Sequence, residues 1–395
     1  MAVDPHISAF LVKLSSAATP LVLQEIRAAT EVGLRALQGE PEPVDAITDF
    51  QTMCHDGQPL RIRAYTPAGC GEETAMPAIV FAHGGGWFQC SLDLYDNPCR
   101  ALANATGCKV YSVDYRLAPE HKFPVPVEDV YAGLQWVSVN ADMLGIDRQR
   151  IAVCGDSAGG NLAAAVAIMS RDRGGPAVAH QLLFYPVMDY AFTTQSYQDY
   201  GRNFFLTEEI MRYCWFTYLL YESDGALPYA SPLRVQTMAG LPAATVLVSE
   251  YDPLRDEGEA YAQRLREGGV AADAHRLPGM VHACIHMLGL TPAARKLFDL
   301  AGRAMRAAFK SKAPARSVFD GPRLQTQPQQ HQKRAEQHEV GHAFDGVGLA
   351  IVQVDGGHQQ RHQHHQGLYG RHRHVDALAG DQGHGFHGGH GQDHR

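Results

Sequence analysis

The chain has 395 residues, of which 45% are hydrophobic, and its formal net charge is −8 at pH 7. This length suits one large domain with additions, and the hydrophobic content is enough for a sizeable core. The negative charge disfavours nucleic acid as the main partner. No membrane span is expected, because the longest uniformly apolar run, 162–169, is far shorter than the roughly 20 residues that a spanning helix needs.

The first part of the chain predicts helices, because leucine and isoleucine recur at spacings of three and four between 5 and 38. Gly39 and Pro41 end that segment. Short β-like runs follow, and from residue 78 they alternate with helical stretches. Strands are expected at 45–54, 60–66, 78–82, 109–113, 151–154, 181–185, 245–249 and 272–277, and helices at 97–106, 125–139, 157–171, 253–267 and 292–310. This alternation predicts an α/β fold, with a mostly parallel eight-stranded sheet between helices.

The segment 187–230 interrupts this alternation with an aromatic-rich helical pattern. Such inserts commonly cover sites at the carboxyl edge of α/β sheets, so we expect it to form a cap together with the N-terminal helices of 1–45. The alternative is an ordinary helical excursion that packs its own core. The catalytic domain is expected to span 46–312, with the segment 187–230 as an insert within it.

A candidate nucleophile lies in the Gly-Asp-Ser-Ala-Gly sequence at 155–159, where an apolar strand runs into the motif and an alanine-rich helix leaves it. A sharp strand-to-helix turn of this kind would hold Ser157 in a strained backbone at a helix N-terminus, where negative charge is favoured. The alternative is that Ser157 is a helix N-cap and the glycines form a loop.

Three consecutive glycines after His83 indicate candidate oxyanion donors, because backbone N–H groups without neighbouring Cβ atoms can approach a ligand closely. We expect the amides of Gly85, Gly86 and Ala158 to serve in this way, with Gly84 less favoured. His83 is interpreted as a residue that orders the loop. A flexible glycine turn is the alternative interpretation.

Four motifs together resemble the bacterial hormone-sensitive-lipase family of α/β-hydrolase esterases. They are His-Gly-Gly-Gly-Trp at 83–87, Tyr-Arg-Leu-Ala-Pro-Glu at 115–120 followed by Phe-Pro at 123–124, Gly-Asp-Ser-Ala-Gly at 155–159 and Asp-Pro-Leu-Arg-Asp-Glu-Gly at 252–258. The resemblance covers about 5–310, in the order and spacing of the family. It implies the α/β-hydrolase fold, a helical cap, and activity on carboxylesters of short to medium acyl chains.

A serine nucleophile needs a base and an acid, which follow it in the order acid, then histidine, in α/β-hydrolases. Glu250 and Asp252 come directly after an apolar strand, and Asp252 opens the matching family motif, so it is expected to be the acid. Asp256 and Glu257 are expected on the solvated or capping face of the next helix. Asp189 is a weaker alternative.

Three histidines downstream are candidates for the base. His275 lies inside the last predicted strand, and His286 lies at what resembles a helix start. His282 follows the strand in a loop, where the base is expected, so it is preferred. The family usually has glycine and an aromatic residue after this histidine, whereas Ala283 and Cys284 stand here, which puts the local pocket shape in question.

The expected reaction is acyl transfer through a covalent intermediate on Ser157, with His282 as the base and Asp252 remaining ionised. It needs no metal or organic cofactor, and the partner is a small-molecule ester, with an acyl chain of about eight carbons or fewer. A homodimer is left open. A lactone, amide or carbamate hydrolase shares this chemistry, and a non-catalytic ligand-binding receptor shares the fold.

The eight cysteines include no Cys-x-x-Cys pair, and the N-terminus lacks a secretory pattern. We therefore expect free thiols and a cytoplasmic protein. Cys284, two residues after His282, would make the enzyme sensitive to thiol reagents if it lined the pocket; a buried inert thiol is the preferred alternative.

The segment 313–395 differs in composition from the rest of the chain. It holds 13 of the 21 histidines, together with many glycines and glutamines, and its acidic and basic residues balance at eight each. Such a composition cannot bury enough apolar surface to order itself. We expect a disordered extension without function; a metal-binding tract is the alternative.

Overall fold

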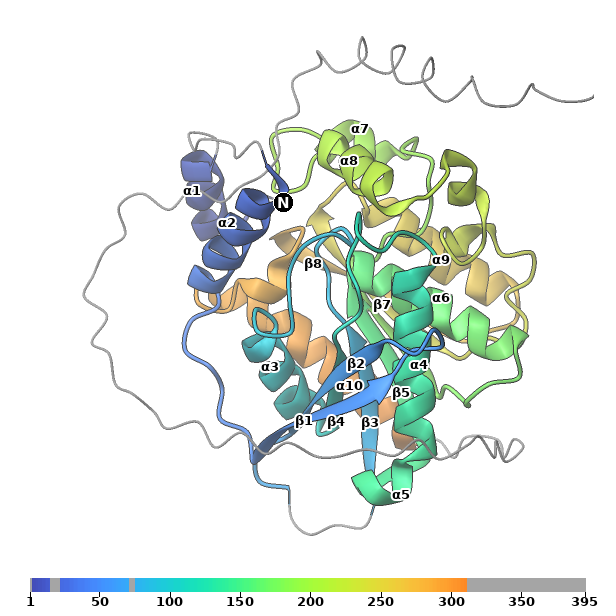
Figure 1. The fold of residues 1–395 in the computed structure, drawn as a ribbon. Coiled ribbons are helices and arrows are strands. Elements are labelled where there is room, and N and C mark those ends of the chain that lie inside the picture. Colours follow the sequence, from blue (N-terminus) through green and yellow to red (C-terminus); the bar gives the residue numbers. More distant parts are fainter. Residues whose placement is uncertain (1, 15–21, 71–74, 311–395) are drawn as a thin grey trace, which may run out of the picture. The chain divides into compact units, whose positions relative to one another are not determined.

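The computed structural model describes residues 2–14, 22–70 and 75–310, so the predictions for the tail 313–395 lie outside the described residues. An eight-stranded sheet runs through the molecule in the order β1-β2-β4-β3-β5-β6-β7-β8 (Figure 1). β2 is antiparallel to both β1 and β4, and every other neighbouring pair is parallel. The predicted mostly parallel α/β sheet is confirmed.

Each predicted strand has a counterpart. The strands are β1 Ala46–Met53, β2 Pro59–Thr66, β3 Met76–Ala82, β4 Lys109–Val113, β5 Ile146–Asp156, β6 His180–Phe184, β7 Ala244–Tyr251 and β8 Ala272–Val281. The central strands are buried on both faces, as their continuous apolar sequences indicate: every residue of β6 is buried, and so are the last five of β3. The sequence pattern underestimated the lengths of β5 and β8, because each strand extends beyond its apolar run.

The principal helices are α1 Pro5–Leu14, α2 Leu23–Ala36, α3 Asp96–Thr106, α4 Val125–Val139, α5 Ala141–Leu144, α6 Ala158–Asp172, α7 Gln195–Tyr200, α8 Glu208–Tyr218, α9 Arg255–Glu267 and α10 Arg295–Lys310. The α10 segment begins with a short 3-10 turn at Pro292–Ala294, and further 3-10 turns occupy Glu222–Ala226, Pro232–Arg234 and Cys284–His286. The short α5 was not predicted. None of the helices in the described ranges is long and apolar enough to cross a membrane.

Two hydrophobic clusters lie on opposite faces of the sheet. One joins α4, α6 and α9 to side chains such as Val80 and Val153, and the other joins α3 and α10 to Phe81 and Cys154. Successive residues of β3 and β5 thus point into different clusters, as the two-residue repeat of a strand requires. Figure 1 shows the sheet between these helices, with α3 and α10 on one side and α4 and α6 on the other.

Candidate active site

Ser157 stands at the turn between β5 and α6 with φ 54° and ψ −121°. This conformation is strained for a residue with a Cβ, at a cost on the order of 1–3 kcal/mol, and persists because surrounding contacts enforce it. Glycine is required on both sides: a Cβ at Gly155 would collide with the Gly159 backbone, and a Cβ at Gly159 with the carbonyl of Ala82. The Ser157 hydroxyl does not cap α6, so the N-cap interpretation does not account for it.

Three predicted residues are joined in one hydrogen-bonded chain. His282 Nδ1 lies 2.7 Å from Asp252 Oδ2, and His282 Nε2 lies 2.9 Å from Ser157 Oγ. A carboxylate can only accept, so Nδ1 carries the proton and Nε2 accepts from the serine hydroxyl. Asp252 follows β7 and His282 follows β8, so the parallel strands bring these side chains to one edge of the sheet.

Local contacts hold this chain in place. Asp252 is fully buried, and its Oδ1 accepts a hydrogen bond of 2.9 Å from the amide of Leu254. The ring of Tyr185 packs edge-on against His282, with ring centroids 4.8 Å apart. The imidazole therefore has a fixed position and a fixed tautomer, as a general base requires.

The alternative acids and bases are engaged elsewhere. Asp189 pairs with Arg234 at 2.5 Å, and Glu250 accepts from the amide of Gly279 at 2.8 Å. His275 lies on β8, as expected. His286 is buried and lies against Gln38 instead of Ser157.

The glycine loop after β3 lines the pocket together with Ser157. Gly85 and Gly86 have φ values of 106° and 58°, and both line the same pocket as Ser157. Ala158 is the first residue of α6, where backbone N–H groups lack an intrahelical acceptor. The amide of Gly84 is already occupied, because it donates to Asp156 Oδ1 at 2.8 Å.

His83 lies beneath this loop, where it contacts the loop's own backbone. Its Nδ1 lies 2.7 Å from the carbonyl oxygen of Gly84, and its ring stacks on Tyr115 with centroids 4.4 Å apart. Burial lowers the pKa of His83, which favours the neutral ring. These contacts agree with its interpretation as a loop-ordering residue.

Sequence reasoning missed Asp156, the residue before the serine. Its buried carboxylate accepts hydrogen bonds from the Gly84 amide and, at 3.0 Å, from the Tyr95 hydroxyl. Burial raises the pKa of Asp156 to about 6, although these donors and the nearby His282 oppose the shift. Asp156 thus ties the nucleophile turn to the glycine loop. Its position between a buried strand and a glycine-rich turn was the available signal.

The prediction that Glu257 lies on a solvated or capping helix face is wrong. Only 2% of this residue is exposed, and its Oε2 accepts hydrogen bonds from the amides of Met188 and Asp189 at 2.6 and 2.7 Å. Burial raises the pKa of Glu257 to about 8. The loop that follows β6 packs over this part of α9. Helix periodicity alone does not reveal such a contact. Asp256 is half-buried and accepts from the Ser196 amide.

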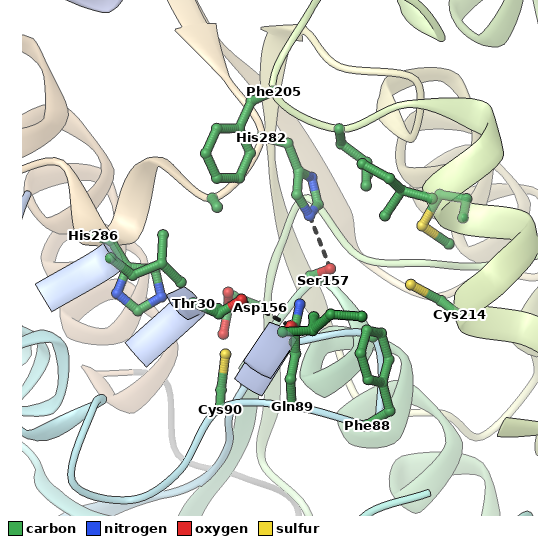
Figure 2. A pocket seen from close by; sticks show the side chains of 18 of the residues that line it. Thr30, Phe88, Gln89, Cys90, Asp156, Ser157, Phe205, Cys214, His282 and His286 are labelled. Carbon is green, nitrogen blue, oxygen red and sulfur yellow. Dashed lines mark hydrogen bonds between the residues drawn. The ribbon is translucent and has the colours of Figure 1, made fainter. Parts of the chain in front are cut away.

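A pocket opens at the Ser157 hydroxyl (Figure 2). Its lining comes from the glycine loop, the serine turn, the His282 loop and the helices α2 and α8. Cys284 does not belong to this lining; it is buried, and burial raises the pKa of its thiol to about 12. The inert-thiol alternative therefore fits Cys284, whereas Cys90 and Cys214 do line the pocket.

All eight cysteines are free, as expected. Within the described ranges, no group of three or more His, Cys, Asp and Glu side chains is arranged to hold a metal ion.

Comparison with known proteins identifies relatives of this chain. Residues 79–286 match a family described as having the alpha/beta hydrolase fold. The chain is 41% identical over 263 residues to the carboxylic ester hydrolase LipN of Mycobacterium tuberculosis, covering 65% of this chain and 68% of that protein. It is 36% identical to an arylesterase of Saccharolobus solfataricus over 315 residues, 78% of this chain and 100% of that one. A solved esterase from the archaeon Pyrobaculum calidifontis superposes with a TM-score of 0.72 at 38% identity, covering 79% of this chain and 100% of that one.

Proposed function

This chain belongs to the α/β-hydrolase family, and we propose that it is a carboxylesterase acting through an acyl-enzyme on Ser157. The observation that carries the proposal is the hydrogen-bonded chain from Ser157 Oγ through His282 to Asp252, which opens onto a pocket. Relatives named as ester hydrolases at 36% to 41% identity support the reaction class.

The proposed cycle begins when His282 Nε2 takes the proton of the Ser157 hydroxyl as the oxygen attacks the ester carbonyl. His282 then protonates the leaving alcohol, and a water molecule repeats the sequence to release the acid. Asp252 remains ionised throughout and stabilises the imidazolium. It also keeps Nδ1 protonated, so that Nε2 is always the nitrogen facing the serine.

The oxyanion formed by attack is proposed to bind the amides of Gly85, Gly86 and Ala158. Fixed donors aimed at this developing charge contribute about 3–4 kcal/mol each to transition-state stabilisation. The Gly84 amide is not included because it donates to Asp156. That hydrogen bond instead sets the position of the loop, so that the following two amides face the serine.

We further propose membership of the hormone-sensitive-lipase branch, with the N-terminal helices of 1–45 and the segment 187–230 acting as a cap. Pocket residues from both segments support this: Ile26 and Thr30 come from α2, and Ile210 and Cys214 from α8. A pocket closed by helix side chains favours acyl chains of about eight carbons or fewer. A p-nitrophenyl ester series with its optimum at sixteen carbons would contradict this limit.

The proposal is tested with a panel of esters, lactones and amides on the wild type and three variants. Asp252→Asn and Ser157→Ala should lower kcat by roughly 10⁴-fold or more with little loss of folded structure. Asp189→Asn is the matched control for the acid and should retain activity. Unchanged ester turnover in Ser157→Ala would refute the mechanism, and lactone hydrolysis without ester hydrolysis would change the substrate class.

A further inference from the structure

The pocket has a polar side that the proposed ester chemistry does not use. In Figure 2, His286 and Thr30 lie on one side of Ser157, whereas Phe88 and Cys214 lie on the other. A plain alkyl ester needs only the apolar side and the oxyanion donors. The polar side therefore has a function only if the substrate carries a polar group there.

The protonation state of His286 follows from its contact with Gln38. The Gln38 amide nitrogen donates to the Leu94 carbonyl at 2.9 Å, which identifies it as the nitrogen and not the oxygen of the amide. The same nitrogen lies 2.8 Å from His286 Nδ1. An amide nitrogen has hydrogens to donate and cannot accept, so Nδ1 is the acceptor. In a neutral imidazole the proton must then be on Nε2.

The ring remains neutral in the folded protein. Burial, together with the nearby His83 and His282, lowers the pKa of His286 to about 3. The Nε2 atom is buried and has no hydrogen-bond partner. Among the described residues that line the pocket, His286 is the one with such a buried, unpartnered polar atom.

Two neighbouring hydroxyl donors are already used. The Thr30 hydroxyl donates to Gln89 Oε1 at 2.9 Å, and the Tyr95 hydroxyl donates to Asp156. Buried donors in proteins are almost always paired, with protein, water or ligand. His286 belongs to the pocket lining, and its Nε2–H, whose position Gln38 fixes, has no acceptor in the described chain.

We propose that His286 forms a polar subsite that selects esters carrying a second oxygen, an ether, carbonyl or hydroxyl group, in the chain that lies on its side of the pocket. The substrate oxygen accepts the hydrogen bond from Nε2–H. This proposal rests on the carboxylesterase activity proposed above and names the substrate class within it. His286 is a specificity residue; it takes no part in proton transfer.

The test uses substrate pairs that differ in one atom. In the acyl arm, p-nitrophenyl pentanoate and hexanoate are compared with esters in which one methylene is replaced by an ether oxygen at successive positions. In the alcohol arm, butyl acetate is compared with 2-methoxyethyl acetate. The measured quantity is the ratio of kcat/KM for the oxygenated ester to that for the alkyl ester. The two arms show which part of the substrate reaches His286.

His286→Phe should lower this ratio about fivefold in one arm, the effect of one neutral hydrogen bond. His286→Gln, which returns an N–H donor, should restore it. His180→Phe is the matched control, because His180 is also a buried histidine with an unpartnered ring nitrogen but lies on β6 outside the pocket lining. Comparing variants on the same pair cancels the intrinsic reactivity of the substrates.

An equal ratio for the wild type and His286→Phe in both arms would overturn the proposal, even if melting temperature and alkyl-ester turnover both fell. That outcome would leave the carboxylesterase proposal intact. If the wild type hydrolyses no ester, nitrogen NMR of the histidine-labelled Ser157→Ala protein decides instead. The proposal requires the Nε2–H tautomer and a shift of that resonance with 2-methoxyethyl acetate but not with butyl acetate; the other tautomer, or no selective shift, contradicts it.

Discussion

Replacing Glu257 with glutamine should remove a large part of the pH dependence of folding stability. The Glu257 carboxyl is buried, its Oε2 accepts from the amides of Met188 and Asp189, and its Oε1 has no partner. Glutamine can offer a carbonyl oxygen to the same two amides but has no charge to bury. The variant therefore isolates the titration of this group with little change in shape.

The magnitude follows from the pKa. Burial raises the pKa of Glu257 from its ordinary 4.5 to about 8. Between these pH values the folded state holds a proton that the unfolded state has lost. The stability linked to this proton is fully present below pH 4.5 and is lost as pH rises through 8. The shift corresponds to about 5 kcal/mol of unfolding free energy.

The assay is urea-induced unfolding of the wild type and Glu257→Gln at pH 5, 7 and 9. The free-energy difference between the two proteins should move in favour of the variant by about 4 kcal/mol from pH 5 to pH 9, because part of the full shift already occurs below pH 5. Glu259→Gln is the matched control, since Glu259 lies on the same helix but is only half-buried and is paired with Arg276. A wild-type–variant difference that stays constant between pH 5 and 9 would show that Glu257 does not hold a proton in the folded protein.

Three further outcomes are expected. Gly86→Ala should lower kcat about 100-fold, because a Cβ would stand 2.5 Å from Cys214 Sγ at a φ of 58° and displace an oxyanion amide; unchanged kcat would count against that donor. Asp156→Asn should lower kcat/KM about tenfold by weakening the charge-assisted bond to the Gly84 amide, as steady-state kinetics would measure. Inhibition by thiol reagents should be slow, and it should be weaker in Cys214→Ser because Cys214 lines the pocket. The Cys284→Ser variant should still be inhibited; if it were resistant, Cys284 would be the reactive thiol.

The fold was predictable because its signals are local. The apolar strands 78–82 and 181–185 are buried on both faces and stand out in the sequence, and each is confirmed by a strand of the sheet. Strand ends were less predictable: β8 continues to Val281 through Pro278 and Gly279, residues that ordinarily end a strand. The short helix α5 lacks the length that a helical period needs to become visible.

The site residues whose roles follow from their order along the chain were predictable. Ser157, Asp252 and His282 follow the ends of β5, β7 and β8, and a parallel sheet brings such ends together. Burial of charged side chains was not predictable in the same way. Asp156 and Glu257 are carboxyls that a sequence places at the surface by default. Their burial depends on segments distant in the chain packing over them, the glycine loop for one and the segment around 188 for the other.

The most direct test of the acyl-enzyme proposal is the covalent labelling of the protein by a p-nitrophenyl phosphonate ester, which traps the serine without subsequent hydrolysis. We predict release of one equivalent of p-nitrophenolate, loss of esterase activity in step with that release, and a phosphonyl group on the peptide that contains Ser157. Ser157→Ala should release none. Labelling at another residue, or continued ester turnover by the fully labelled protein, would contradict the central role of Ser157.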